Sequence, residues 1–347
     1  MELARAQAPG KQARRSFKMI REVNVLIALI VLSTIIAVLN PRFLSPYNIQ
    51  ILIRQIALFA VIAVGETFVI ITGGIDLSPG SMTALSGIIC TLAMANGWSV
   101  TLAIIATLAM SALIGLGHGL AVTRLGIPPF IITLGTYSIA RGAAAVITKG
   151  WPIVNIPASF LFLGQGIILG IPVPVIIAVA VAVFATYILR FSVIGRHIYA
   201  IGGNIEAARL SGIDVNRRIT FCFITSAVLA GVTGIVVASR LGQGQPAVGT
   251  EYELIAIASS VIGGTSLQGG SGTVLGALIG ASILSVLNNG LVLLEVSAYW
   301  HQIAVGCVVV IAVLSDVLQR RAGARRALIA KLITGKNPGG GVSAGLK

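Results

Sequence analysis

A succession of about ten apolar runs constrains the fold of this chain more than any other feature of its sequence. Crossing the hydrocarbon core of a bilayer takes about 20 apolar residues in a helix that rises 1.5 Å per residue. Charged residues make up only 10% of the chain, against roughly a quarter in soluble domains. The sequence therefore predicts an all-α, polytopic transmembrane bundle of about ten helices. The runs are 23–39, 49–72, 81–96, 98–122, 130–148, 171–190, 219–240, 253–267, 273–294 and 298–318.

The distribution of basic residues predicts the orientation of these helices. With the N-terminus inside, 19 of the 24 Lys and Arg residues flank the cytoplasmic side, as the positive-inside rule requires. We therefore expect basic cytoplasmic tails at 1–22 and 319–347, a transmembrane domain at 23–318, and a cytoplasmic loop at 190–218. The basic tails also suit anionic lipid. Nucleic acid is not a predicted partner, because no stacking aromatic residues are interleaved with the charges.

Two glycine-rich stretches interrupt the apolar runs and resemble each other. Aligning residues 73–85 with 263–275 gives seven identities in thirteen positions. Gly and Pro disfavour a helix interior, and paired breaks in two halves of a transporter point to a substrate path. The alternative is that these glycines only allow close packing of helices. The predicted break glycines are Gly73, Gly74 and Gly80 in the first stretch and Gly263, Gly264 and Gly270 in the second.

The run 253–267 is too short to cross a bilayer comfortably. Its uninterrupted part, 253–262, would be a helix of about 15 Å, half of the hydrocarbon core. The sequence leaves open whether this segment spans the membrane or is re-entrant.

Signatures of enzymes and metal sites are absent from the sequence. It contains no G-x-x-x-x-G-K-[ST], H-E-x-x-H or G-x-S-x-G motif. The three histidines and three cysteines are scattered singly, so we predict neither a metal site nor an enzyme. Energy for active transport would then come from an ion gradient or from a separate ATPase subunit.

Three charged residues are candidates for an ion-coupling role in the middle of the membrane. Glu66 lies deep in the second run, where it either hydrogen-bonds a neighbouring helix or has a functional role. Asp76 lies in the first break, and we favour capping of the helix that begins near Ser78-Pro79 over contact with a substrate. Arg141 is close enough to the end of its run to snorkel. Three dispersed charges do not form a proton relay.

The polar loop 190–218 carries the signals of a short helix. Asn204 suits an N-cap, Glu206 suits the positive start of the helix, and Gly212 suits its C-terminal cap. A helix of about two turns is not stable alone. It therefore has to pack against its own bundle or against a partner.

At this loop the sequence resembles a known family. Residues 199–204 and 206–213 are similar to the cytoplasmic loop of monosaccharide ABC-transporter permeases of the ribose, xylose and arabinose type. The resemblance covers nearly the whole chain. It also includes residues 40–43, 73–81, 134–136, 141–142, 245–246, 249–254, 263–267 and 287–291.

The resemblance implies a ten-helix permease of the bacterial inner membrane that works as a homodimer. Such a permease is joined by a cytoplasmic ATPase, which binds the ATP, and is served by a periplasmic or lipid-anchored sugar-binding protein. The chain itself would hold no cofactor. The residues implied to dock on the ATPase are Asn204, Glu206, Ala207, Ala208, Arg209 and Gly212.

The residues that contact the solute are less sharply predicted than the partners. Asn288 and Asn289 suit sugar hydroxyls, but amides also join helices to one another. The other candidates for the pathway are Glu66, Thr72, Asp76, Ser78 and Ser266. The alternatives for function are an ABC permease for a polyol, a nucleoside or a branched-chain amino acid, and an autonomous secondary carrier or channel.

Overall fold

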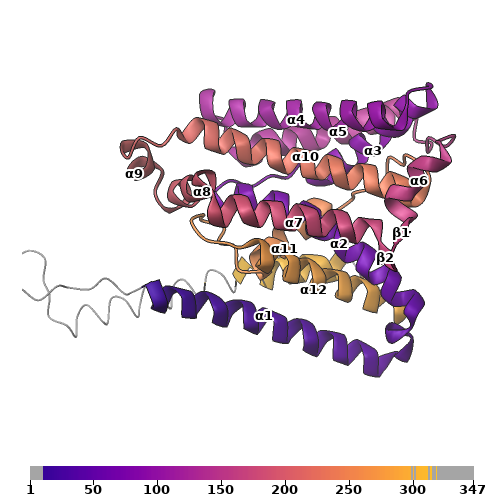
Figure 1. The fold of residues 1–347 in the computed structure, drawn as a ribbon, viewed down its shortest axis with the longest axis horizontal. Coiled ribbons are helices and arrows are strands. Elements are labelled where there is room, and N and C mark those ends of the chain that lie inside the picture. Colours follow the sequence, from indigo (N-terminus) through magenta and orange to yellow (C-terminus); the bar gives the residue numbers. More distant parts are fainter. Residues whose placement is uncertain (1–10, 298–299, 301, 312, 315–317, 319–347) are drawn as a thin grey trace, which may run out of the picture.

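The computed structural model describes residues 11–297, 300, 302–311, 313–314 and 318, and the described chain is almost entirely helical (Figure 1). Its helices lie roughly side by side along the longest axis of the molecule. The elements are α1 (Lys11–Leu39), a 3-10 turn η1 (Pro41–Leu44), α2 (Pro46–Ile71), α3 (Pro79–Ala95), α4 (Val100–Arg124), α5 (Pro129–Thr148), α6 (Ala158–Gln165), β1 (Ile167–Ile168), β2 (Ile171–Pro172), α7 (Val173–Phe191), α8 (Val193–Gly203), α9 (Ile205–Leu210), α10 (Val215–Leu241), α11 (Tyr252–Ile262) and α12 (Val274–Leu293).

Six of the described helices are long and apolar enough to cross a membrane, namely α2, α4, α5, α7, α10 and α12. The protein is thus a multi-pass helical membrane protein, as predicted. Shorter apolar helical segments lie at 23–39, 79–95, 252–262 and 302–311. Helix α11 has 11 residues, about 16 Å, so it is too short to span a bilayer. Part of the predicted run 298–318, residues 1–10 of the predicted N-terminal tail and the whole predicted tail 319–347 lie outside the described residues. Residues 11–22, which were predicted as part of the N-terminal tail, belong to α1.

Helix α10 is the centre around which the described helices pack. It lies against α2, α3 and α4, and small residues bring the backbones close together. Gly234 of α10 faces Gly87 of α3, and a Cβ added to Gly87 would lie 3.0 Å from the Gly234 carbonyl oxygen. Gly65 of α2 approaches Ser226 of α10 in the same way, at 3.1 Å from its Cα. Small residues at such crossings are typical of helix association in membranes.

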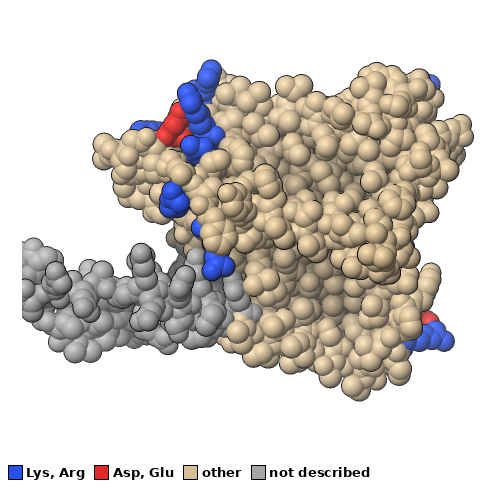
Figure 2. All heavy atoms as spheres, viewed as in Figure 1, with Lys and Arg blue, Asp and Glu red and all other residues tan. Residues whose placement is uncertain are grey.

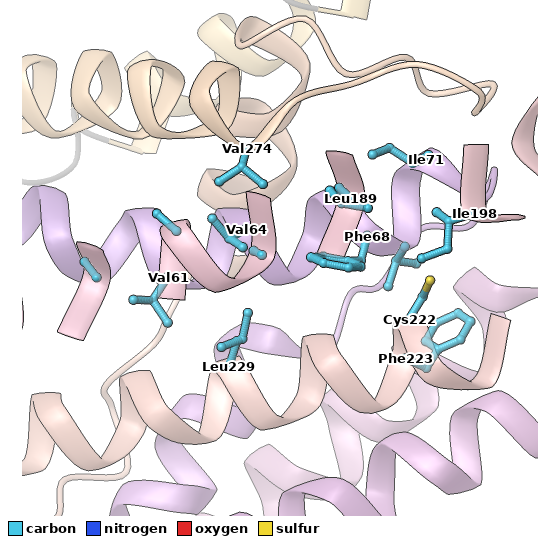
Figure 3. Close-up of a cluster of buried hydrophobic side chains, with 14 of the residues drawn as sticks. Val61, Val64, Phe68, Ile71, Leu189, Ile198, Cys222, Phe223, Leu229 and Val274 are labelled. Carbon is cyan, nitrogen blue, oxygen red and sulfur yellow. The ribbon is translucent and has the colours of Figure 1, made fainter. Parts of the chain in front are cut away.

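A buried apolar cluster joins α2 to α7, α8 and α10 (Figure 3). Phe68 and Ile71 of α2 lie between Leu189 of α7, Ile198 of α8 and Phe223 of α10, and all five side chains are buried. Every residue of α2 from Ala57 to Ile71 is buried, so this half of the helix is surrounded by protein. The cluster fixes the end of α2, where the first glycine-rich stretch begins.

Basic side chains gather at one end of the molecule, over α8 and α9 (Figure 2). We call this the basic end.

Helix α8 was not predicted from the sequence, which indicated only the shorter helix that follows it. Ser192 caps α8 by accepting a hydrogen bond from the Gly195 amide at 3.1 Å. The α8 face with Ile198 and Ile201 is buried, while Arg196 is exposed.

Candidate functional site

Helix α2 ends at Ile71, and the chain then leaves the helical path over residues 72–78, which we call the first break. The Thr72 hydroxyl donates to the Val69 carbonyl at 2.7 Å, so it satisfies the end of its own helix. Gly73 has φ +86°, a conformation that residues with a Cβ rarely adopt. The Gly74 amide also donates to Val69, at 3.2 Å. The first break therefore begins with a glycine turn.

Asp76 is the polar centre of the first break. Its Oδ1 accepts hydrogen bonds from the Ser78 amide at 2.9 Å and the Ser78 hydroxyl at 2.6 Å. Its Oδ2 accepts from the Ser226 hydroxyl of α10 at 2.8 Å. The Asp76 amide donates to Glu66 Oε1 of α2 at 3.2 Å. Because Glu66, Asp76 and Ser78 are fully buried, these bonds hold the break to both helices in an apolar setting.

The structure corrects the prediction for Asp76 and identifies the hydrogen-bond partner of Glu66. Asp76 does not cap α3, because the N-cap residue is Ser78 and no side chain accepts a capping bond there. The Asp76 carboxylate instead bonds Ser78 just before the helix begins. Glu66 accepts its bond from the break and not from a neighbouring helix, and its Oε2 has no hydrogen-bond partner among the described residues.

The end of the first break is tied to α5 and to the chain before α11. The Leu77 amide donates to the Thr133 hydroxyl at 3.0 Å. Gly80, in the first turn of α3, lies so close to Gly249 and Glu253 that a side chain at this position would meet both. The predicted break residue Gly80 thus belongs to α3, where its lack of a side chain lets Gly249 and Glu253 pack against the helix.

Residues 263–273, the second break, follow α11 and precede α12. Gly264, Gly269 and Gly270 have φ of +98°, +86° and +73°. The Ser266 amide donates to the Ser271 carbonyl, and the Gly269 amide donates to the Ser266 carbonyl, both at 2.9 Å. The Ser266 hydroxyl is buried and has no partner among the described residues. Backbone bonds therefore shape this loop.

The two breaks meet each other and the end of α8. The Gly270 amide donates to the Ile71 carbonyl at 2.8 Å. Gly202 of α8 lies against both groups, with no room for a Cβ. The Tyr199 hydroxyl donates to the Gly272 carbonyl at 2.8 Å, and burial raises the pKa of Tyr199 to about 12. The basic end is thus in direct contact with both breaks.

Helix α9 has the caps that the sequence predicted. Asn204 Oδ1 accepts from the Ala207 amide at 2.9 Å, and Gly212 has φ +78°. Ala208 is buried, whereas Ala207 is exposed. Glu206 and Arg209 form an exposed pair at 3.6 Å. Exposed ion pairs contribute little to stability. Apart from the buried Ala208, the residues of this short helix are open to solvent or to a partner.

The predicted amides of α12 lie far from the breaks. Asn289 and Asn48 exchange hydrogen bonds of 2.8 and 3.0 Å between their side chains. Asn48 is 23 residues from Ile71 on α2, about 35 Å along the helix. This pair fits the alternative in which amides join helices, while Asn288 is half-buried. The structure therefore does not bring Asn289 together with Glu66, Asp76 or Ser78.

Sequence reasoning missed several residues near these elements. Ser226 gives no signal in the sequence, because it is one of five Ser and Thr residues in a long, mostly apolar helix. Arg141 does not only snorkel, since its Nη1 donates to the carbonyls of Pro246 and Val248 at 3.0 and 2.7 Å. Glu253 was not predicted as a site residue, yet it is buried beside Gly80. No group of residues within the described part of the chain could hold a metal ion.

The fold defines a polytopic α-helical membrane protein. Residues 48–313 match the family described as "Branched-chain amino acid transport system / permease component", and the chain belongs to this family. It is a transport permease and not an enzyme.

Named relatives cover most of the chain. The ribose import permease protein RbsC of Haemophilus influenzae is 45% identical over 299 residues, which is 85% of this chain and 93% of the relative. RbsC of Bacillus subtilis is 43% identical over 313 residues, 89% and 97% of the two chains. The D-allose transport system permease protein AlsC of Escherichia coli is 39% identical over 293 residues, 83% and 90% of the two. No solved structure matches the chain.

Proposed function

We propose that this chain is the transmembrane subunit of an ABC importer that carries D-ribose or a closely related monosaccharide. The observation that supports this most strongly is the similarity to ribose import permeases along nearly their whole length. Other permeases for small solutes, including branched-chain amino acids, are the alternatives within the family. An autonomous carrier is the alternative outside it.

The proposed importer has three kinds of partner. A second copy of the permease completes the membrane part, a cytoplasmic ATPase binds the ATP, and a sugar-binding protein delivers the solute from outside. The exposed helix α9 supports the ATPase partner, because its caps fix its geometry and most of its surface is uncovered. Its docking residues are proposed to be Asn204, Glu206, Ala207, Ala208, Arg209 and Gly212.

We assign the basic end to the cytoplasm. Its Lys and Arg residues follow the positive-inside rule, and the assignment places both tails, 1–22 and 319–347, on the same side. The transmembrane domain is then 23–318, with about ten segments, in the inner membrane. In this arrangement α8 and α9 form the cytoplasmic loop 190–218 that couples the ATPase to the bundle.

The two breaks are proposed to shape the solute pathway. The similarity of their sequences suggests a duplicated element, in which a helix is followed by a glycine-rich segment and then by the next helix. Apolar side chains from the end of α2, from both breaks and from α11 pack together there, namely Ile70, Ile75, Leu77, Ile257, Val261, Ile262 and Leu267. Glu66, Thr72, Asp76, Ser78 and Ser266 lie on or beside these breaks, whereas Asn288 and Asn289 lie on α12.

Reconstitution with the ATPase and the binding protein tests this function. We expect D-ribose uptake by proteoliposomes that requires ATP and the binding protein. Uptake by this chain alone would contradict the ABC assignment, and uptake of L-leucine without D-ribose would favour the amino acid alternative.

The docking role of α9 is tested separately. Glu206→Lys reverses a charge on the exposed helix, and Gly212→Pro removes a residue with positive φ. We expect both variants to insert in the membrane and to lose ATPase coupling. Glu295→Lys, which changes an exposed acid on the loop after α12, is the matched control and should transport normally. Full transport in both α9 variants would show that this helix is not the coupling element.

A further inference from the structure

Two groups of opposite charge inside the bundle have atoms that no described residue satisfies. Glu253 is 8% exposed, and its Oε2 has no hydrogen-bond partner among the described residues. Arg141 likewise has a buried Nη2 without a partner there. Buried polar atoms are rarely left unpaired, so each such atom calls for an explanation. Charged residues within a membrane bundle are a default indication of function.

Three elements bring Glu253 and Arg141 into the same region. Glu253 lies in the first turn of α11 and packs against Gly80 in the first turn of α3. The Gly249 carbonyl packs against Gly80 as well. Arg141 of α5 donates to the Val248 carbonyl at 2.7 Å, next to Gly249 in the chain.

The Arg141 guanidinium is held in place, and its buried Nη2 has no partner among the described residues. Its Nη1 is fixed by the two carbonyl groups of Pro246 and Val248. Its Cζ lies 5.7 Å from the centre of the Tyr137 ring, in a cation–π contact. The free Nη2 is therefore preorganised as a donor. Glu253 supplies an acceptor with the opposite charge.

The chemistry of the free atoms indicates which solute they suit. A sugar hydroxyl both donates and accepts, so adjacent hydroxyls can bond a carboxylate and a guanidinium together. Glu253 and Arg141 carry opposite charges, and half-buried Glu251 lies two residues from Glu253. An uncharged hydroxyl group can bond to groups of either sign. One to two turns further along α11, Ile257 and Val261 pack with Ile75 in an apolar cluster, which offers no such bonds.

We propose that Glu253 and Arg141 bind hydroxyl groups of the transported monosaccharide, with Glu253 Oε2 as acceptor and Arg141 Nη2 as donor. This assignment rests on the proposed function of the chain as a sugar permease. It places recognition where the beginnings of α3 and α11 meet, apart from the acids of the first break. Asp76 has no free carboxylate oxygen, because Ser78 and Ser226 occupy both.

Sugar uptake by the reconstituted complex tests the assignment. Glu253→Gln and Arg141→Lys should each lower ATP-driven D-ribose uptake about tenfold or more, the effect of losing one hydrogen bond to a charged group. ATPase stimulation by the binding protein should stay within about twofold of wild type, because α9 lies at the other end of the bundle. Glu251→Gln, a half-buried acid two residues away, is the control and should transport normally.

A binding measurement separates recognition from a purely structural role. Saturation-transfer NMR of D-ribose with the purified permease–ATPase complex, without the binding protein, should give a signal for wild type and Glu251→Gln. Glu253→Gln should lose it. Loss of uptake with an unchanged NMR signal would overturn the assignment, as would normal uptake in Glu253→Gln.

Two further results keep the proposals apart. If Glu253→Gln does not accumulate in the membrane, Glu253→Asp, which retains the carboxylate, is tested in its place. Failure of both variants to accumulate would assign the residue to folding and overturn the proposal. If the wild-type complex itself takes up no D-ribose, the sugar function fails. If the wild-type complex takes up D-ribose and the Glu253 and Arg141 variants take it up equally well, the sugar function stands and this assignment alone is wrong.

Discussion

The two breaks have similar sequences but are stabilised in different ways. In the first break, the side chain of Asp76 receives bonds from Ser78 and from Ser226 of α10. In the second break, backbone amides of Ser266, Gly269 and Gly270 donate to backbone carbonyls. A glycine-rich composition thus determines where the helix stops, while the surroundings determine what satisfies the freed backbone groups.

The aligned glycines also differ in backbone conformation. Gly73 has φ +86°, whereas its counterpart Gly263 has φ −66°. Gly80 lies inside α3, whereas its counterpart Gly270 has φ +73° and lies outside a helix. The sequence similarity therefore does not extend to the same path of the chain. This comparison teaches that a buried carboxylate adds to the single glycine turn of the first break, whereas the second break contains three glycines with positive φ.

The largest expected effect is on the first break. Asp76→Leu leaves the Ser226 hydroxyl and two donors of Ser78 unsatisfied, and each unsatisfied buried donor costs about 1–3 kcal/mol. We expect a loss of at least about 3 kcal/mol, seen as low membrane abundance and a lower thermal midpoint in detergent. Asp76→Asn keeps an acceptor and should lose less. Equal stability of Asp76→Leu and wild type would show that side chains do not hold this break.

A smaller effect is expected for one glycine of the second break. Gly270→Ala places a Cβ on a residue with φ +73°, which costs about 1–2 kcal/mol, and it crowds the Gly202 carbonyl. Thermal unfolding in detergent measures this loss. Gly135→Ala in α5 meets no atom within 4 Å and should be neutral or stabilising. If both substitutions behave alike, the conformation of Gly270 is not needed.

The smallest effect concerns the contact between α8 and the second break. Tyr199→Phe removes one hydrogen bond to Gly272, worth about 1 kcal/mol. Folding favours the neutral phenol, because burial raises the pKa of Tyr199 to about 12 from its usual value of about 10. The stability from Tyr199 is therefore complete below about pH 10 and is lost as the pH rises toward 12.

Thermal unfolding in detergent across this pH range measures the difference in stability between wild type and Tyr199→Phe. The Phe variant should lose less stability than wild type between neutral and strongly alkaline pH. Parallel pH curves would contradict a buried, hydrogen-bonded Tyr199.

Local signals account for what the sequence predicted correctly. Gly73 to Pro79 marked the end of α2 and the start of α3, and Asn204 and Gly212 marked the ends of α9, because caps and breakers act within a few residues. The pairing of Asp76 with Ser226, 150 residues apart, depends on how α10 packs and has no local signal. The roles of Gly202 and Gly80 depend on distant backbone segments, so the sequence shows the glycine but not the neighbour that requires it.

The contact at Gly202 has a mechanical consequence. A side chain could bend and absorb a small displacement, but here the backbone of α8 lies directly against the Ile71 carbonyl and the Gly270 amide. These two groups are themselves hydrogen-bonded, so neither yields alone. A displacement of the end of α8 toward these groups would therefore meet the backbone of α2 and that of the second break at the same point.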